Sequence, residues 1–138
     1  MPESELQPHH PIVTWGTRLI GIGLIALGLH VFAPSLAAWG YGVAPVDQNG
    51  TAYLQATGMR DLALGLMTLY LLSRFRRSIG VFLMCMLVIP ISDTIIVLQY
   101  GTASWKILPH AAGLIGIAVI IFFAFKEQRN LDDGHRTE

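Results

Sequence analysis

The chain has 138 residues, of which 53% are hydrophobic and 13% are charged, against about 25% charged residues in an ordinary soluble domain. Its nine Lys and Arg residues balance nine Asp and Glu residues, so no net basic charge attracts nucleic acid, and nucleic acid is excluded as a partner. The length accommodates about four helices of roughly 20 residues joined by short loops. We therefore predict an all-α protein, a polytopic membrane four-helix bundle in contact with membrane lipid.

Apolar runs and turn residues divide the chain into a tail, four spans and a second tail. Residues 1–11 are polar and rich in proline, and we expect them to be disordered. A four-helix transmembrane domain is expected over residues 12–125, and a polar C-terminal tail over residues 126–138. The predicted spans cover about residues 12–38, 53–73, 79–100 and 105–125.

The second predicted span carries two adjacent charges, Arg60 and Asp61. A charge at the centre of a membrane helix costs about 2.5–3.5 kcal/mol, so such residues normally face a bundle interior and mark a functional site. Asp61 shares a helical face with Gly58, Gly65 and Thr68. We therefore expect Asp61 to point inward, and Arg60 to lie at the flank and reach a second partner or extend toward the interface.

Small residues recur at helical spacing in the first and fourth spans. Gly16, Gly23 and His30 follow each other at seven-residue intervals, and Gly113 and Gly116 lie one turn apart. Glycine faces let membrane helices approach closely. We expect close helix contacts at both faces, which also offer surfaces for a homo-oligomer or a membrane partner protein.

The third predicted span contains Pro90 and, one turn later, Asp93. Proline lacks a backbone donor and leaves the carbonyl of Met86 without its helical partner, so a kink is expected just before Asp93. Asp93 is then a second acid at membrane depth.

Basic residues set the expected orientation. Arg74, Arg76 and Arg77 cluster between the second and third spans, whereas the loop after the first span has no Lys or Arg. By the positive-inside rule, this cluster and both termini face the cytoplasm. The expected location is an integral, multi-pass position in the plasma membrane, or in the inner membrane if the source is bacterial.

This topology places ionisable residues from all four spans at one depth, about 8–12 Å inside the outer ends of the helices. We predict a polar pocket in the outer half of the bundle. Its centre is predicted to contain Arg60, Asp61, Asp93, His30 and His110, and its rim Gln55, Gln99, Tyr53, Tyr100, Trp105 and Lys106. The candidates for proton exchange are Asp61, Asp93, His30 and His110, with Asp93 as the acid and Asp61 as the base.

A metal site is not predicted in this pocket, because no helix carries a His-x3-His or Glu-x2-His pair and Arg60 would repel a cation. No cofactor is predicted either. The single cysteine, Cys85, excludes an intrachain disulfide.

Several segments together carry a resemblance to a known family. They are Arg18 through Pro34, Tyr41-Gly-Val-Ala-Pro45, the second span with its Gly58-x-Arg60-Asp61 motif, Asp93, and Trp105 through His110. The chain resembles a family of small four-helix integral membrane proteins known only as a domain of unknown function, and it is loosely similar to the DoxX-like group. The resemblance implies a four-helix fold and no particular activity.

Several functions remain open from the sequence. The polar cluster could be a structural network that fixes helix register, or it could line a pocket for a lipophilic small molecule. In that pocket the acids and histidines could also act as a membrane-embedded isomerase, cyclase or hydrolase. The last alternative is an accessory subunit or a proton-linked carrier.

Overall fold

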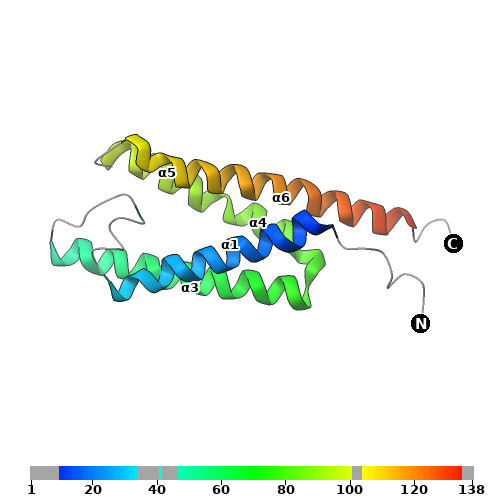
Figure 1. Ribbon diagram of the computed structural model, residues 1–138, viewed down its shortest axis with the longest axis horizontal. Helices are drawn as coiled ribbons and strands as arrows, with labels where there is room; N and C mark the ends of the chain where they lie inside the picture. The colour runs from blue at the N-terminus through cyan, green and yellow to red at the C-terminus, as the bar shows by residue number, and fades with distance from the viewer. Residues whose placement is uncertain (1–9, 34–40, 42–46, 101–103, 135–138) are drawn as a thin grey trace.

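The computed structural model describes residues 10–33, 41, 47–100 and 104–134, and these form helices without any strand. Helix α1 packs antiparallel against α3, and α4 and α5 lie along α6, so the molecule is built of two helix pairs (Figure 1). The helical segments in order are α1 (Pro11–Leu29), η2 (His30–Phe32), α3 (Gln48–Arg74), η3 (Arg76–Ser78), α4 (Ile79–Met86), α5 (Val88–Tyr100), η4 (Ser104–Lys106) and α6 (Ile107–Gly134).

Helix α1 is shorter than the predicted first span. It starts at Pro11, a favoured first helical residue, and the His10 side chain accepts a hydrogen bond from the backbone N–H of Ile12. After η2 the backbone leaves the helical region at Ala33, because the following Pro34 disfavours a helical residue before it. The remainder of the predicted span, 34–38, and residues 1–9 of the predicted tail lie outside the described residues.

Helix α3 begins at Gln48 rather than at position 53, where the sequence predicted the second span to start. Asp47 has an extended backbone, and its Oδ1 accepts a hydrogen bond of 2.8 Å from the N–H of Gly50. This N-cap supplies a partner to an unpaired donor of the first turn. Asn49 and Gly50, which precede the predicted span, therefore belong to the helix.

The third predicted span consists of two helices that meet at Leu87. The N–H of Leu87 is shared between the carbonyls of Leu83 and Met84, and Pro90 follows in the first turn of α5. The interruption lies where the proline predicted a kink, since Pro90 cannot donate to the carbonyl one turn earlier. It sets the direction of α5, and with it the position of Asp93.

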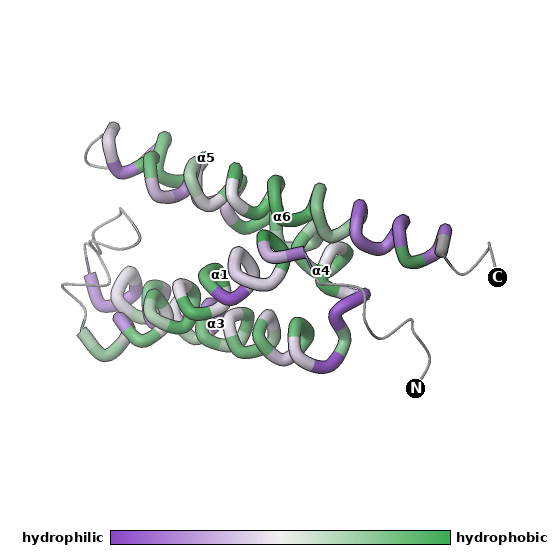
Figure 2. Tube along the Cα trace, turned by 45° about the vertical axis from the view of Figure 1, so that its right-hand side comes forward, coloured by the Kyte–Doolittle hydropathy of each residue, from purple (hydrophilic) through white to green (hydrophobic). Residues whose placement is uncertain are grey.

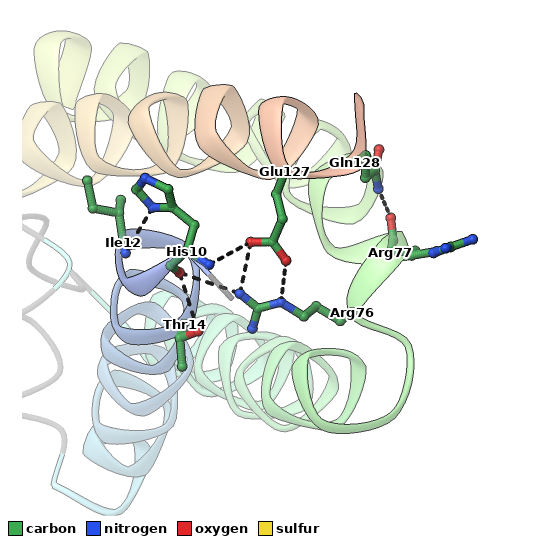
Figure 3. Close-up of polar contacts among 7 residues, drawn as sticks. All are labelled: His10, Ile12, Thr14, Arg76, Arg77, Glu127 and Gln128. Carbon is green, nitrogen blue, oxygen red and sulfur yellow. Dashed lines mark hydrogen bonds and ion pairs between the residues drawn. The ribbon is translucent and has the colours of Figure 1, made fainter. Parts of the chain in front are cut away.

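Helix α6 continues past the predicted end of the fourth span at position 125 and ends at Gly134. Three contacts with distant parts of the chain support its last turns (Figure 3). Both carboxylate oxygens of Glu127 accept hydrogen bonds from Arg76, at 2.7 and 3.1 Å, and Glu127 also accepts from the backbone N–H of His10. Gln128 donates to the carbonyl of Arg77. These contacts hold the start of α1, η3 and the end of α6 together.

Helices α1 and α3 are in contact through glycines. A Cβ atom on Gly28 would lie 2.7 Å from the Gly58 carbonyl oxygen, and one on Gly65 would lie 2.7 Å from the Gly21 carbonyl oxygen. Such distances require that neither helix carries a side chain there. The predicted inward face of α3 is confirmed, because Gly58, Asp61, Gly65 and Thr68 are its buried residues.

The other predicted glycine contacts turn out differently. Gly16 does pack closely, since a Cβ there would lie 2.7 Å from the Ile120 side chain. A Cβ on Gly23, Gly113 or Gly116 would meet nothing within 4 Å. The expectation of close helix contacts at Gly113 and Gly116 is therefore wrong within the described residues, and the same holds for Gly23.

The buried apolar core occupies the half of the bundle that contains the start of α1 and the last turns of α6. Its members come from α1, α4 and α6, namely Val13, Ile79, Leu83, Met86, Ile117, Ile120 and Ala124. Toward the opposite end the pair of α1 and α3 diverges from the pair of α5 and α6 (Figure 1). The polar residues of the candidate site lie where the pairs diverge.

The outer surface of the helices is apolar. Figure 2 shows hydrophobic residues along most of each helix, and hydrophilic residues toward the ends of α3 and α6. Large side chains such as Leu19, Leu98, Ile115 and Phe122 are exposed, which in water would leave far more apolar surface than a soluble monomer carries. Within the described residues, three stretches are long and apolar enough to cross a membrane: Pro11–Leu29, Arg76–Tyr100 and Ile107–Asp133. The fold is that of an all-α membrane bundle.

Candidate functional site

The centre of the site is a group of three charged side chains. Arg60 donates from Nε to Asp61 Oδ1 at 2.9 Å, its Nη2 lies 2.8 Å from the same oxygen, and it lies 3.8 Å from Asp93 Oδ2. Asp61 is 2% exposed, Asp93 24% and Arg60 39%. Arg60 thus lies at the flank of α3 and bridges two acids from different helices, as its position on the helix suggested.

Tyr41 completes this group, although it was not predicted as a site residue. Its hydroxyl donates a hydrogen bond of 3.0 Å to Asp61 Oδ2, so both carboxylate oxygens of Asp61 have donors. Burial raises the pKa of the Tyr41 phenol above its usual value, and the neighbouring Asp61 charge raises it further. Tyr41 therefore remains a donor over the physiological range. Tyr41 lies between α1 and α3 in the sequence, where no helical periodicity predicts the direction of its side chain.

A cavity of about 390 Å³ adjoins the charged group. Helices α1, α5 and α6 each contribute one stripe of residues at helical spacing, α3 contributes Asp61, and α4 contributes Met86. The ionisable side chains in its lining are Asp61, Asp93 and His110. The remaining lining residues are Ile20, Gly23, Leu24, Leu27, Met86, Ile89, Pro90, Pro109, Gly113 and Ile117.

Two glycines help to leave this space open. Gly23 of α1 and Gly113 of α6 line the cavity, and a Cβ atom on either would meet nothing within 4 Å. The cavity also begins where the apolar core ends, because Met86 and Ile117 belong to both. A mostly apolar space with a few polar groups at one side is the usual composition of a small-molecule site, and its volume lies within the common range of about 300–1,000 Å³.

His110 enters the cavity from the first turn of α6. Pro109 precedes it, a position where the missing proline N–H costs little because the first turn has no intrahelical acceptor for it. His110 Nε2 is buried and has no hydrogen-bond partner among the described residues. A buried polar atom is nearly always paired in a native structure, so this nitrogen is a group that a bound molecule could satisfy.

The structure does not bring every predicted pocket residue to the cavity. His30 instead makes a hydrogen bond of 2.8 Å with the Ala26 carbonyl of its own helix. None of the predicted rim residues lines the cavity: Gln55, Gln99, Tyr53, Tyr100 and Trp105 are exposed, and Lys106 is half-buried. Tyr53 is 79% exposed and points away from the bundle interior.

The arrangement favours recognition of an uncharged or weakly polar molecule over a cation. Within the described residues, no three His, Cys, Asp or Glu side chains come together as a metal site would require. Arg60 supplies positive charge beside both acids. The groups that a molecule in the cavity would meet are the Asp93 carboxylate, the His110 ring and apolar side chains.

Helices with apolar outer faces and a polar group in the interior define a small α-helical membrane protein. Residues 16–124 match the family described as Domain of unknown function (DUF4267), and the chain belongs to this family. The predicted family of uncharacterised membrane proteins is thereby confirmed, while the similarity to the DoxX-like group stays a prediction. No curated protein and no solved structure matches the chain.

Proposed function

We propose that this protein is a multi-pass integral membrane protein that binds a lipophilic small molecule in the cavity beside Asp61, Asp93 and His110. The observation that carries the proposal is the buried, unpartnered Nε2 of His110, a residue that lines this mostly apolar space. A molecule with an apolar body and one polar end would fill the space and pair with that nitrogen.

The contacts divide the two acids into different roles. Asp61 is occupied on both oxygens by Arg60 and Tyr41, whereas among the described residues Asp93 has only the longer contact of 3.8 Å with Arg60. Asp61 therefore organises the site, and Asp93 and His110 meet the ligand. In a purely structural network, Asp61→Asn and Asp93→Asn would instead both lower stability, and no retained molecule would be involved.

The test is native mass spectrometry of the gently purified protein, followed by organic extraction of whatever it retains. We expect the wild type to hold a lipophilic molecule and Asp93→Asn to hold it with at least several-fold lower occupancy while remaining folded. The matched control is Asp132→Asn, an exposed acid near the end of α6. An empty wild type, or equal occupancy in Asp93→Asn, would contradict the proposal.

A second candidate function is acid–base catalysis on the bound molecule. It is favoured by the presence of a carboxylate and an imidazole in one cavity wall, because one group can remove a proton while the other returns it. In deuterated water, an isomerase of this kind would place deuterium on carbon of the extracted molecule, and Asp93→Asn would not. If the wild type places no deuterium on carbon, catalysis of this kind is ruled out and binding is the remaining function.

A further inference from the structure

A second cleft, distinct from the cavity, lies between α1 and the last turns of α3. It has a volume of about 480 Å³, and three arginines, Arg18, Arg74 and Arg76, line it without any carboxylate. Thr14 and Ser73 also line it, and Leu69 and Leu72 supply its apolar part. Positive charge and apolar surface therefore occur in one hollow.

The arginines differ in how much of their charge is already neutralised. Arg76 is paired through two hydrogen bonds with Glu127, which approaches from the α6 side (Figure 3). Arg18 and Arg74 make no ion pair with a carboxylate in the described part of the chain. Two guanidinium groups thus remain for an anion, and guanidinium binds phosphate oxygens through paired N–H donors.

The position of the cleft matches the boundary between the apolar part of a membrane and its headgroups. The Arg18 guanidinium lies 4.8 Å from the centre of the Trp15 ring, so the side chain extends toward the N-terminal end of α1. Trp15, Tyr70 and Phe75 are exposed at the same end of the bundle, and exposed aromatic residues are typical of membrane interfaces. Leu69 and Leu72 line the cleft on the side nearer the apolar middle of α3.

We propose that this cleft binds the phosphate headgroup of an anionic phospholipid, with Arg18 and Arg74 holding the phosphate and Leu69 and Leu72 contacting the start of an acyl chain. Basic pockets between membrane helices bind such headgroups, and each arginine near the surface strengthens attraction to anionic lipid. The positive-inside orientation predicted from the sequence would place the cleft in the leaflet where anionic lipids concentrate.

The experiment adds phosphatidylglycerol or phosphatidylcholine of equal chain length to the detergent-purified protein and counts bound lipids by native mass spectrometry. The wild type should retain phosphatidylglycerol in preference to phosphatidylcholine. Arg18→Gln and Arg74→Gln should each weaken phosphatidylglycerol retention about fivefold, and the double variant about 30-fold. The double lysine variant, R18K with R74K, keeps the charge but loses the paired N–H donors, so it should bind phosphatidylglycerol more weakly than the wild type and more tightly than the double glutamine variant.

The control is Arg77→Gln, which removes the same charge from a side chain that points away from Glu127 and does not line the cleft (Figure 3). It should retain phosphatidylglycerol as the wild type does. The proposal is overturned if the double glutamine variant binds as the wild type does, or if Arg77→Gln loses as much as that variant. Displacement of the lipid by equimolar inorganic phosphate would also overturn it, since the site would then recognise a free anion.

Discussion

At the scale of single residues, the Asp61 carboxylate shows what an acid needs in order to lie inside an apolar bundle. It is 2% exposed and receives donors on both oxygens, from Arg60 and Tyr41. Removing one partner of a buried charge is costly because the remaining charge is then unpaired. Tyr41 should therefore matter for stability although it lies outside the helices that carry the charges.

Tyr41→Phe should lower the free energy of unfolding by about 1–3 kcal/mol, because it leaves one oxygen of a buried carboxylate without a donor. Thermal unfolding in mild detergent measures the change. Tyr53→Phe is the matched control, since Tyr53 is 79% exposed. Equal unfolding temperatures for both variants and the wild type would show that the contact contributes nothing.

The same residue predicts a dependence on alkaline pH. The pKa of Tyr41 is raised in the folded protein from its ordinary value of 10.0, so above about pH 10 the unfolded state releases a proton that the folded state keeps. The contribution of Tyr41 is fully present below pH 10 and declines as the pH rises further. A stability profile should fall less steeply above pH 10 in Tyr41→Phe than in the wild type, and parallel profiles would contradict this.

At the scale of helices, the glycines fall into two groups that their spacing does not distinguish. Gly21, Gly28, Gly58 and Gly65 bring α1 and α3 together, whereas Gly23 and Gly113 border the cavity. The first group lets the backbones of α1 and α3 approach closely. The second group leaves the volume of the cavity free of side chains.

Gly65→Ala should destabilise the protein by about 1–3 kcal/mol, because the new methyl group would lie 2.7 Å from a backbone oxygen of Gly21 and neither backbone can move aside cheaply. Gly23→Ala should be neutral or slightly stabilising, since its methyl group meets nothing within 4 Å and alanine is the better helix former. Thermal unfolding of the two variants side by side distinguishes them. The reverse order would show that the helix pairing is wrong.

These cases also show how far the sequence predicted the site. The inward direction of Asp61 and the flanking position of Arg60 follow from helical periodicity, a local property, and the structure agrees with both. Contacts between distant segments were beyond such an argument. Tyr41 reaches Asp61 from a connecting segment, and Glu127 pairs with Arg76 across the bundle.

The boundaries of the helices were predicted less well for a related reason. Apolar composition suggested where the spans begin and end, but the helix boundaries depend on capping residues. The Asp47 N-cap starts α3 before its apolar run. Ala33, which precedes Pro34, ends η2 before the predicted end of the first span. Whether a glycine such as Gly113 faces a helix or a cavity depends on how the helix pairs diverge, which spacing within one helix does not contain.

At the scale of the whole molecule, the start of α1 and the last turns of α6 lie at the same end of the bundle (Figure 1). The hydrogen bond from the backbone N–H of His10 to Glu127 joins them. Two helix ends on the same side of a membrane are consistent with an even number of membrane-spanning helices. We expect reporters placed after Glu138 and next to Arg76 to be cytoplasmic, and one next to Gln48 to lie on the opposite side. A reporter at Gln48 on the same side as the other two would show that α3 does not cross the membrane.

If the cavity holds a lipophilic molecule, a side chain that fills the cavity should exclude that molecule without changing any charged group. Gly113→Leu places a side chain in the cavity from a helical position where a Cβ meets nothing within 4 Å. Gly116→Leu is the matched control, equally unobstructed and in the same helix but not lining the cavity. Both substitutions should favour the helix, so neither should unfold the protein.

The measurement is the occupancy of the co-purifying molecule by native mass spectrometry in these two variants and the wild type. We expect Gly113→Leu to lose the molecule and Gly116→Leu to retain it at the wild-type level. Retention of the molecule by Gly113→Leu at the same occupancy would contradict the claim that the cavity is its binding site.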